Sequence, residues 1–255
     1  MIEEKNTEQN NLSAGMEEVC KQLRLPTIGH QYHRIIQRYE KEVAAQKKAE
    51  EVLYALLTSE REGRQIKARL KRIKEAEFPR LKRFEELDVG SLPSGAQTHL
   101  EALKRLEFLQ KNQNVILVGN AGTGKSHMSI ACGIEACEKG YRVSFKTAAG
   151  LVNELKESKS QRHLVALNKK NEKIDLLILD ELGYISFDKE GAELLFSYLA
   201  MRYETKSTII TTNLNFSDWN RIFQEEALTI ALLDRVTQNA RIINMNGSSY
   251  RRKKP

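Results

Sequence analysis

The sequence predicts an α/β fold with a five-stranded parallel sheet flanked by helices, preceded by a small N-terminal all-helical domain. From about residue 80 onward, strand-like and helix-like segments alternate, which is typical of a parallel sheet with helices on both faces. A glycine-rich loop at 119–126 joins an apolar run to a helical pattern. Residues 13–79 contain few glycines and place apolar residues at helical spacing.

The N-terminal part is expected to be helical at residues 16–23, 27–42 and 45–74, where apolar residues recur at helical spacing. Pro79 and the stretch 88–95 mark a linker. The expected organisation is a disordered segment at 1–12, a helical DNA-binding or partner-binding domain at 13–79, an α/β domain at 80–251 and a basic tail at 252–255.

The α/β part is expected to contain five strands, because five runs of apolar or β-branched residues occur there. They are residues 114–118, 142–146, 174–179, 207–212 and 240–245. Helical patterns separate these runs, near 97–110, 125–138, 148–157, 189–203 and 216–236.

Composition narrows the class of protein. The chain has 255 residues, 40% hydrophobic and 29% charged residues, which is ordinary for a globular protein. The net charge of +7 favours a polyanionic partner such as nucleic acid. Three cysteines without C-x-x-C spacing indicate neither a zinc site nor a disulfide framework. No apolar run is long enough to cross a membrane and the N-terminus is unlike a signal peptide, so we expect a cytoplasmic location.

Residues 119–126 read Gly-Asn-Ala-Gly-Thr-Gly-Lys-Ser and fit the phosphate-binding pattern G-x-x-x-x-G-K-[ST]. In that pattern, backbone N–H groups and the positive end of the following helix surround a phosphate. Lys125 can reach the β- and γ-phosphates, and the Ser126 hydroxyl can bind Mg²⁺. The residues expected to contact the nucleotide are Gly119, Asn120, Ala121, Gly122, Thr123, Gly124, Lys125, Ser126 and His127.

An acidic pair, Asp180 and Glu181, ends the third apolar run. In a nucleoside triphosphatase the first acid lies near Mg²⁺ and the second polarises the attacking water. The side chains at the carboxyl end of a parallel strand can reach the ligand crevice. This pair could also merely cap a strand exit, but downstream of a full phosphate loop the hydrolytic interpretation is favoured.

Two later residues have both a functional and an ordinary interpretation. Asn213 follows the β-branched run 207–212, where it could hydrogen-bond the attacking water or simply start a turn. Arg235 could stabilise a transferring phosphoryl group, or form a surface ion pair with its neighbour Asp234. The residues alone favour the ordinary interpretation in both cases.

Together these motifs resemble the IstB-type transposition helper ATPases, relatives of the DnaC and DnaI helicase loaders in the AAA+ superfamily. Besides the phosphate loop, the resemblance rests on Asp-Leu-Leu-Ile-Leu-Asp-Glu-Leu-Gly-Tyr at 175–184 and Thr-Thr-Asn-Leu-Asn-Phe-Ser-Asp-Trp at 211–219. It also includes Arg202-Tyr-Glu, Asp-Arg-Val at 234–236 and Gly-Ser-Ser-Tyr-Arg at 247–251. It extends into the N-terminal part through Leu-Arg-Leu-Pro-Thr-Ile at 23–28 and Lys-Glu-Ala-Glu-Phe-Pro at 74–79.

The resemblance implies an AAA+ ATPase that uses ATP and Mg²⁺. It implies that Ser126 and Asp180 assist the metal, that Glu181 is the general base and that Asn213 senses the γ-phosphate. Arg235 would be an arginine finger acting on the ATP of a neighbouring subunit, and Arg251 a second sensor. The implied partners are double-stranded DNA, a transposase and further copies of the same chain.

A basic segment offers a candidate DNA contact, made of Arg64, Lys67, Lys71, Arg72 and Lys74. Its charges suit sequence-independent phosphate binding, although many basic helices are simply solvated.

Two alternatives to a transposition helper stay open. One is a replicative helicase loader with the same fold, and the other is an ATP-gated scaffold with little turnover.

Overall fold

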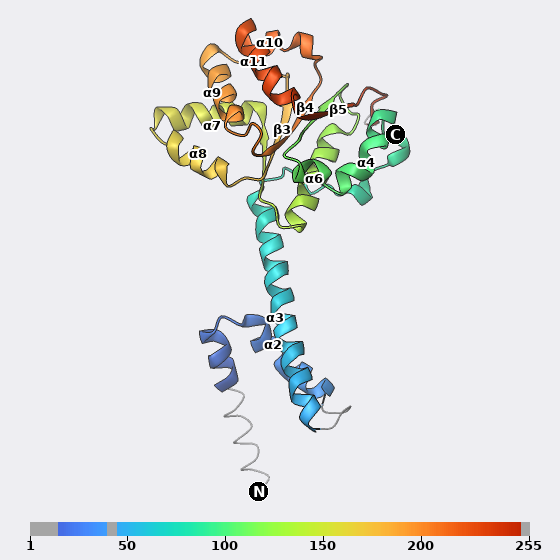
Figure 1. Cartoon of the computed structure of the whole chain (residues 1–255), viewed down its shortest axis with the longest axis vertical. Coiled ribbons are helices and arrows are strands. Elements are labelled where there is room, and N and C mark those ends of the chain that lie inside the picture. The colour runs from blue at the N-terminus through green and yellow to red at the C-terminus, as the bar shows by residue number, and fades with distance from the viewer. Residues whose placement is uncertain (1–14, 40–44, 251–255) are drawn as a thin grey trace. The chain divides into compact units, whose positions relative to one another are not determined.

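The computed structural model describes residues 15–39 and 45–250 and divides the chain into two compact units (Figure 1). The division falls between Leu70 and Lys71, inside a long helix, α3 (Ala45–Glu75). The predicted disordered segment 1–12 and basic tail 252–255 lie outside the described residues. None of the described helices combines the length and the apolar character that a membrane span requires.

The N-terminal unit contains helical residues 15–22, α2 (Pro26–Tyr39) and the first part of α3. Its core is small and includes Cys20, Ile28, Tyr32 and Leu56. Polar contacts join the two longer helices. The buried carboxylate of Glu60 on α3 accepts hydrogen bonds from the first backbone N–H groups of α2, Thr27 (2.9 Å) and Ile28 (3.1 Å), and the Ser59 hydroxyl donates to Gln31 Oε1 (2.7 Å). A carboxylate at a helix N-terminus satisfies N–H groups that have no partner within the helix.

The C-terminal unit has one five-stranded parallel sheet with the order β2-β3-β4-β1-β5. The predicted α/β fold is therefore confirmed. The strands are β1 (Asn114–Val118), β2 (Val143–Thr147), β3 (Leu176–Leu182), β4 (Ser207–Thr212) and β5 (Ala240–Asn244). The predicted ranges of the first and fourth strands are reproduced, and those of the others differ by one to three residues at an end.

Helices cover both faces of the sheet (Figure 1). One face carries α4 (Ser94–Lys104), α5 (Glu107–Gln110) and α6 (Lys125–Glu138). The other carries α7 (Ala148–Ser160), α9 (Lys189–Ala200), α10 (Asn220–Phe223) and α11 (Glu226–Thr237), with α8 (Leu164–Glu172) packed against α7. Three short 3₁₀ turns complete the unit, η1 (Phe84–Glu86), η2 (Val89–Ser91) and η3 (Phe216–Asp218).

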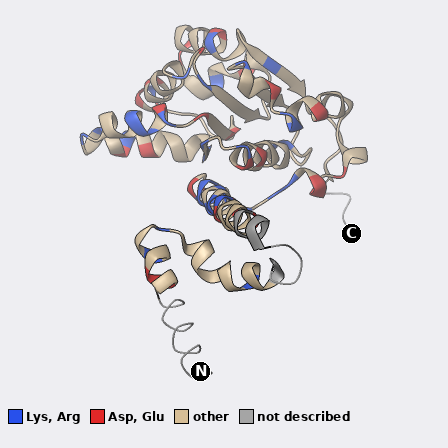
Figure 2. Ribbon diagram, turned by 60° about the horizontal axis from the view of Figure 1, so that its bottom comes forward, with Lys and Arg blue, Asp and Glu red and all other residues tan. Residues whose placement is uncertain are grey.

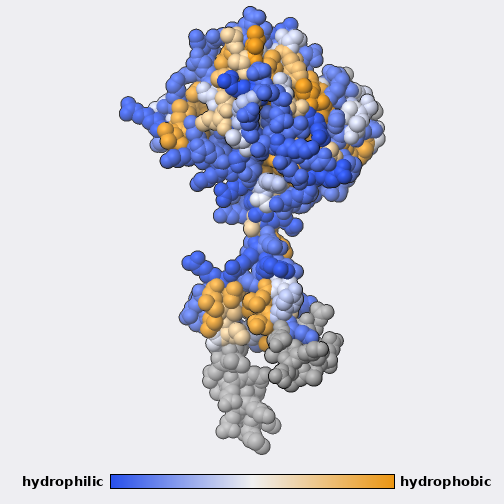
Figure 3. Space-filling model, in the orientation of Figure 1, coloured by the Kyte–Doolittle hydropathy of each residue, from blue (hydrophilic) through white to orange (hydrophobic). Residues whose placement is uncertain are grey.

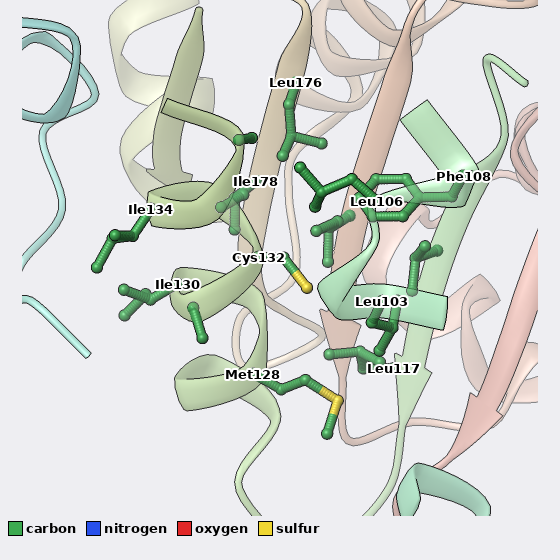
Figure 4. Close-up of a cluster of buried hydrophobic side chains, with 14 of the residues drawn as sticks. Leu103, Leu106, Phe108, Leu117, Met128, Ile130, Cys132, Ile134, Leu176 and Ile178 are labelled. Atoms are coloured by element: carbon green, nitrogen blue, oxygen red, sulfur yellow. The ribbon is translucent and has the colours of Figure 1, made fainter. Parts of the chain in front are cut away.

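Two buried cores lie on either side of the sheet because successive strand residues point to opposite faces. On β3, Leu176 and Ile178 enter the core under α6, which Figure 4 shows, while Leu177 and Leu179 enter the other core. The second core is closed by the fully buried Trp219. The side chains of residues 176–179 are all fully buried, so β3 is anchored on both faces just before its acidic pair.

Arg202 anchors the amino ends of β3 and β4, opposite the edge where the acidic pair lies. The residue is 3% exposed, and its guanidinium donates to the backbone carbonyls of Ile174 (3.2 Å), Asp175 (3.3 Å) and Ser207 (2.9 Å). Burial lowers the pKa of Arg202 to about 10, so the group is still charged at neutral pH. The motif residue Arg202 thus serves the architecture of the sheet.

Three details differ from the expected helices. The single helix expected near 97–110 is divided into α4 and α5 at Leu106, whose φ is +60°. The helix expected near 216–236 is divided into η3, α10 and α11, with Gln224 at φ +56° between the last two. The helix α8 was not predicted.

Candidate functional site

The phosphate loop connects β1, an interior strand between β4 and β5, to α6. Lys125, the first residue of α6, is buried, and its ammonium group donates to the carbonyl oxygens of Gly119 (2.5 Å) and Asn120 (2.6 Å). The Thr123 hydroxyl also donates to the carbonyl of Asn120 (2.9 Å). These contacts fold the loop back on itself at the N-terminus of α6, where phosphate binding is favoured by the helix dipole.

Two glycines of this loop make room for the chain that follows β5. A Cβ atom on Gly119 would lie 2.3 Å from the backbone carbon of Met245, and one on Gly122 would lie 2.2 Å from Ser249 Oγ. The backbone N–H of Met245 donates to Val118 (2.6 Å), and that of Tyr250 donates to Gly122 (2.9 Å). Residues 245–250, hereafter the C-terminal segment, therefore pack directly on the phosphate loop.

The acidic pair is split by an irregularity in β3. Leu179 pairs with Ile210 and Leu182 pairs with Thr212, so Asp180 and Glu181 together face a single β4 residue. This is a β-bulge, a feature that re-aims side chains and often occurs beside functional sites. Asp180 is buried, whereas Glu181 is exposed and has a φ of +62°.

Asp180 faces the phosphate loop. The Ser126 hydroxyl donates to Asp180 Oδ1 at 3.0 Å, as a Mg²⁺ site shared by these two residues would require. Mg²⁺ prefers oxygen ligands and is commonly bound by one or two carboxylates together with substrate phosphates. The described residues contain no group of three or more His, Cys, Asp or Glu side chains placed to hold a metal ion. Ser126 and Asp180 thus fit a cation that arrives with a nucleotide.

A pocket of ≈ 630 Å³ opens beside these residues. The loop residues 121–127, both acids and Thr211 line it, and Pro79, Leu87, Leu92 and Ile130 supply apolar walls. Tyr184 and Tyr250 also line it, the latter from the C-terminal segment. A volume of several hundred Å³ with apolar walls and a few convergent polar groups is typical of a small-molecule site.

Most of the predicted nucleotide contacts meet in this pocket. His127 lines it, and its Nε2 lies 2.9 Å from the carbonyl oxygen of Arg83. The predicted second sensor, Arg251, lies outside the described residues. Sequence reasoning did not assign Thr211, Tyr184 and Tyr250 to the site, although all three lie in the motifs of the resemblance. The contact of Thr211 with the acidic pair depends on the bulge, which the sequence does not reveal.

Asn213 and Arg235 lie elsewhere. Asn213 is exposed just after β4, with its side-chain oxygen beside Gly183, and is not among the described residues that line the pocket. The Arg235 guanidinium stacks over the Phe196 ring, 4.5 Å from its centroid, and donates to the carbonyl of Ala231 at 3.4 Å. Arg235 therefore does not contribute to the pocket of its own chain.

Three of the five residues predicted to contact DNA have partners within the protein, although the Lys71–Glu75 ion pair is long (3.7 Å) and exposed. Arg64 pairs with Glu60 (3.0 Å) and donates to the carbonyl of Arg24 (2.7 Å). Arg72 donates to the carbonyl of Cys137 at the end of α6 (2.8 Å). Lys67, Lys71 and Lys74 are exposed, and their spacing places them on one face of α3.

The phosphate loop follows the interior strand β1 and the acidic pair lies near the end of β3, two strands away, which places the C-terminal unit in the class of phosphate-loop nucleotide-binding α/β proteins. Two solved structures share this fold: DnaI (TM-score 0.56, 19% identity, covering 64% of this chain and 90% of that one) and AMPPCP-bound DnaA from Aquifex aeolicus (TM-score 0.54, 22% identity, covering 66% and 50%). At such identities the likeness concerns the fold alone.

The chain belongs to the family of IstB-like ATP-binding proteins, whose family model matches residues 18–255. It is 37% identical over 179 residues to a Bacillus thuringiensis subsp. berliner protein named for ATP binding and for insertion sequence IS232, covering 70% of this chain and 72% of the relative. It is 36% identical over 203 residues to the IS21 counterpart of Pseudomonas aeruginosa, covering 80% and 77%. A Geobacillus stearothermophilus relative from IS5376 is 31% identical over 234 residues, 92% of each chain.

The packing of Ser249 on Gly122 generates a prediction. Gly122→Ala should destabilise the protein more than Gly140→Ala, because Gly140 has a similar φ (+101°) but open space around it. The backbone strain of about 1–2 kcal/mol is common to both, and only Gly122→Ala adds a collision. Thermal unfolding of both variants measures the difference, and adding Ser249→Gly to Gly122→Ala should reduce it. Equal losses in the two single variants would show that Ser249 is not held against the loop.

Proposed function

We propose that this chain is an Mg²⁺-dependent ATPase that assembles with copies of itself on double-stranded DNA and recruits and stimulates a transposase. Membership of a family of insertion-sequence proteins supports the transposition context. The main support for ATP hydrolysis is the bulge in β3, because it gives the adjacent residues Asp180 and Glu181 different environments and so allows them different roles.

Each residue of the pocket has a distinct role in this proposal. Lys125 and the loop N–H groups bind the phosphates, and Ser126 and Asp180 hold Mg²⁺, which neutralises charge on the β- and γ-phosphates when bound. Glu181 is left exposed in the pocket wall, where it can accept a proton from the attacking water. These two roles require a buried acid beside the Ser126 hydroxyl, which is Asp180, and an exposed acid in the same pocket, which is Glu181.

Two further residues, Asn213 and Arg235, are proposed to take part in hydrolysis although they do not line the pocket. Asn213 directly follows β4, the strand next to the acidic pair, and is the proposed sensor of the γ-phosphate. Arg235 lies on α11 and not in its own pocket, which supports action on the nucleotide of a neighbouring subunit. In this proposal ATP hydrolysis depends on assembly.

The DNA contact in this proposal is the lysine stripe, defined as Lys67, Lys71 and Lys74. Figure 2 shows Lys and Arg distributed along α3 among acidic residues, so the helix is not uniformly positive. Arg64 and Arg72 donate to backbone carbonyls of the protein, whereas the stripe is exposed and its Lys71 makes only a long, exposed ion pair with Glu75 (3.7 Å). The stripe is therefore the part of the predicted basic segment that we propose for phosphate contact.

The N-terminal unit also exposes apolar side chains that suit a protein partner such as the transposase. Figure 3 shows apolar residues gathered on this unit. Leu23, Leu53, Tyr54 and Leu57 are all more than half exposed, and contiguous exposed apolar surface is typical of protein interaction sites. A helicase-loading role is disfavoured, because the relatives at 30% identity or more are named for insertion sequences.

Glu181→Gln should retain ATP binding and lose turnover by about 100-fold or more, because general acid–base groups contribute 10²–10⁴-fold. Nucleotide affinity and steady-state phosphate release measure the two effects. Glu172→Gln, which removes an exposed carboxylate from the end of α8, is the control and should behave like the wild type. If the wild type and Glu181→Gln release phosphate equally slowly, the chain is an ATP-gated scaffold.

Arg235→Ala should bind ATP normally and lose assembly-stimulated hydrolysis by about 10³-fold, in the range of other arginine fingers. Mixing it with Glu181→Gln should restore turnover, because some interfaces then combine an intact Arg235 with an intact Glu181. Arg221→Ala removes an exposed arginine whose ion pair is local, and serves as the control. A mixture no more active than its components would refute action across the interface.

Replacing the lysine stripe with glutamine should weaken DNA binding and flatten its dependence on salt. Each lysine that no longer neutralises a phosphate should lower the slope of log K against log salt by about 0.9. Affinity for a duplex measured at several salt concentrations gives this slope. Replacing Lys104, Lys111 and Lys139 removes the same charge elsewhere and should leave the slope unchanged; if both triple variants change it equally, α3 is not the contact.

A further inference from the structure

Thr211 is the β4 residue opposite the bulge in β3. Because Asp180 and Glu181 together face this one position, the backbone N–H of Glu181 has no regular place in the ladder between the two strands. The Thr211 hydroxyl supplies the missing acceptor, with an N–H to Oγ1 separation of 3.0 Å. A side chain of β4 therefore takes the place of a backbone carbonyl.

The same hydroxyl also contacts Asp180, the other acid of the pair. Thr211 Oγ1 donates to Asp180 Oδ1 at 2.5 Å, and the side chain is 1% exposed. A hydroxyl has one hydrogen to donate and lone pairs to accept, so both contacts can be made together. The result is a relay from the Glu181 N–H through Thr211 to the Asp180 carboxylate.

This relay fixes the two acids relative to each other. Asp180 Oδ1 accepts from Thr211 on one side and from Ser126 on the other, which leaves the carboxylate little freedom to rotate. Glu181 is held at φ +62°, a conformation that costs a non-glycine residue energy and persists only where neighbours enforce it. The contact with Thr211 is one such constraint.

We propose that Thr211 is a positioning residue for ATP hydrolysis: its hydroxyl orients the Asp180 carboxylate for Mg²⁺ and holds the bulge that directs Glu181 into the pocket. This inference rests on the proposed ATPase function. Thr211 does not contact the reacting atoms in this role, but acts through the two acids.

The test compares Thr211→Val and Thr211→Ala, which remove the hydroxyl, with Thr211→Ser, which keeps it. Thr208→Val is the matched control, because Thr208 is also a buried threonine of β4 but lies at the other end of the strand. The affinity for a fluorescent ATP analogue is measured with Mg²⁺ and with a chelator, together with the turnover of ATP and the melting temperature.

The expected result is a reduction of about 10-fold or more in the tightening of nucleotide binding by Mg²⁺ for the Val and Ala variants, as for other residues that orient a metal ligand. Their affinity in chelator should stay within about twofold of the wild type, and their turnover at saturating Mg²⁺ and ATP should fall. Thr211→Ser should resemble the wild type. Thr208→Val should keep the wild-type Mg²⁺ effect and turnover, although loss of its contact with Arg202 Nε (3.3 Å) should lower the melting temperature. Because Thr211 acts through Asp180, adding Thr211→Val to Asp180→Asn should cause no further loss of the Mg²⁺ effect.

Three results would overturn the inference: an unchanged Mg²⁺ effect in the Val and Ala variants, an equal loss of affinity with and without Mg²⁺, or unfolding of both variants, which would make Thr211 merely structural. Failure of the proposed function is distinguishable. A wild type that binds ATP with Mg²⁺ but does not hydrolyse it refutes the ATPase proposal, while the Mg²⁺ effect still tests Thr211.

Discussion

The hydrogen bonds that converge on Asp180 Oδ1 are the interaction on which the site depends. Through them the first turn of α6, the end of β3 and the end of β4 meet at one oxygen atom, which accepts from Ser126 and Thr211. These two residues are 54 and 31 positions from Asp180 along the chain, so only the folded sheet brings them together. The parallel topology makes this possible, because all carboxyl ends lie at the same edge.

A second constraint acts on the other side of the phosphate loop. The absence of a Cβ on Gly119 and Gly122 is usually explained by phosphate, but here the chain after β5 occupies the space that those atoms would fill. The loop is therefore held between Asp180 and the C-terminal segment, which itself contributes Tyr250 to the pocket wall. The C-terminal segment therefore packs against the backbone of the same loop that is expected to bind phosphate.

Much of the fold was predictable because local and tertiary preferences agree. After their first residues, the ranges 114–118 and 207–212 consist of apolar or β-branched residues, and the structure reproduces both ranges. The helix breaks at Leu106 and Gln224 could not be predicted, because neither residue is a glycine or a proline. We attribute the positive φ of these two residues to tertiary packing. The bulge was equally hidden: Leu-Asp-Glu-Leu reads as a continuous strand end, and nothing in it indicates that two residues will face one.

For the site residues too, the role of a residue depends on its surroundings in the fold, which the sequence does not show. Arg202 and Arg235 both occur in the motifs of the resemblance, yet Arg202 is buried against backbone carbonyls while Arg235 is stacked on a ring outside the pocket. Arg64 and Arg72 resemble Lys67 and Lys74 in the sequence, but the two arginines bond to carbonyl oxygens of the protein itself. An arginine fork can satisfy several carbonyls at once, whereas a lysine keeps a compact charge on a flexible stem. Within this part of α3, the arginines Arg64 and Arg72 thus hold the structure, while Lys67 and Lys74 remain exposed.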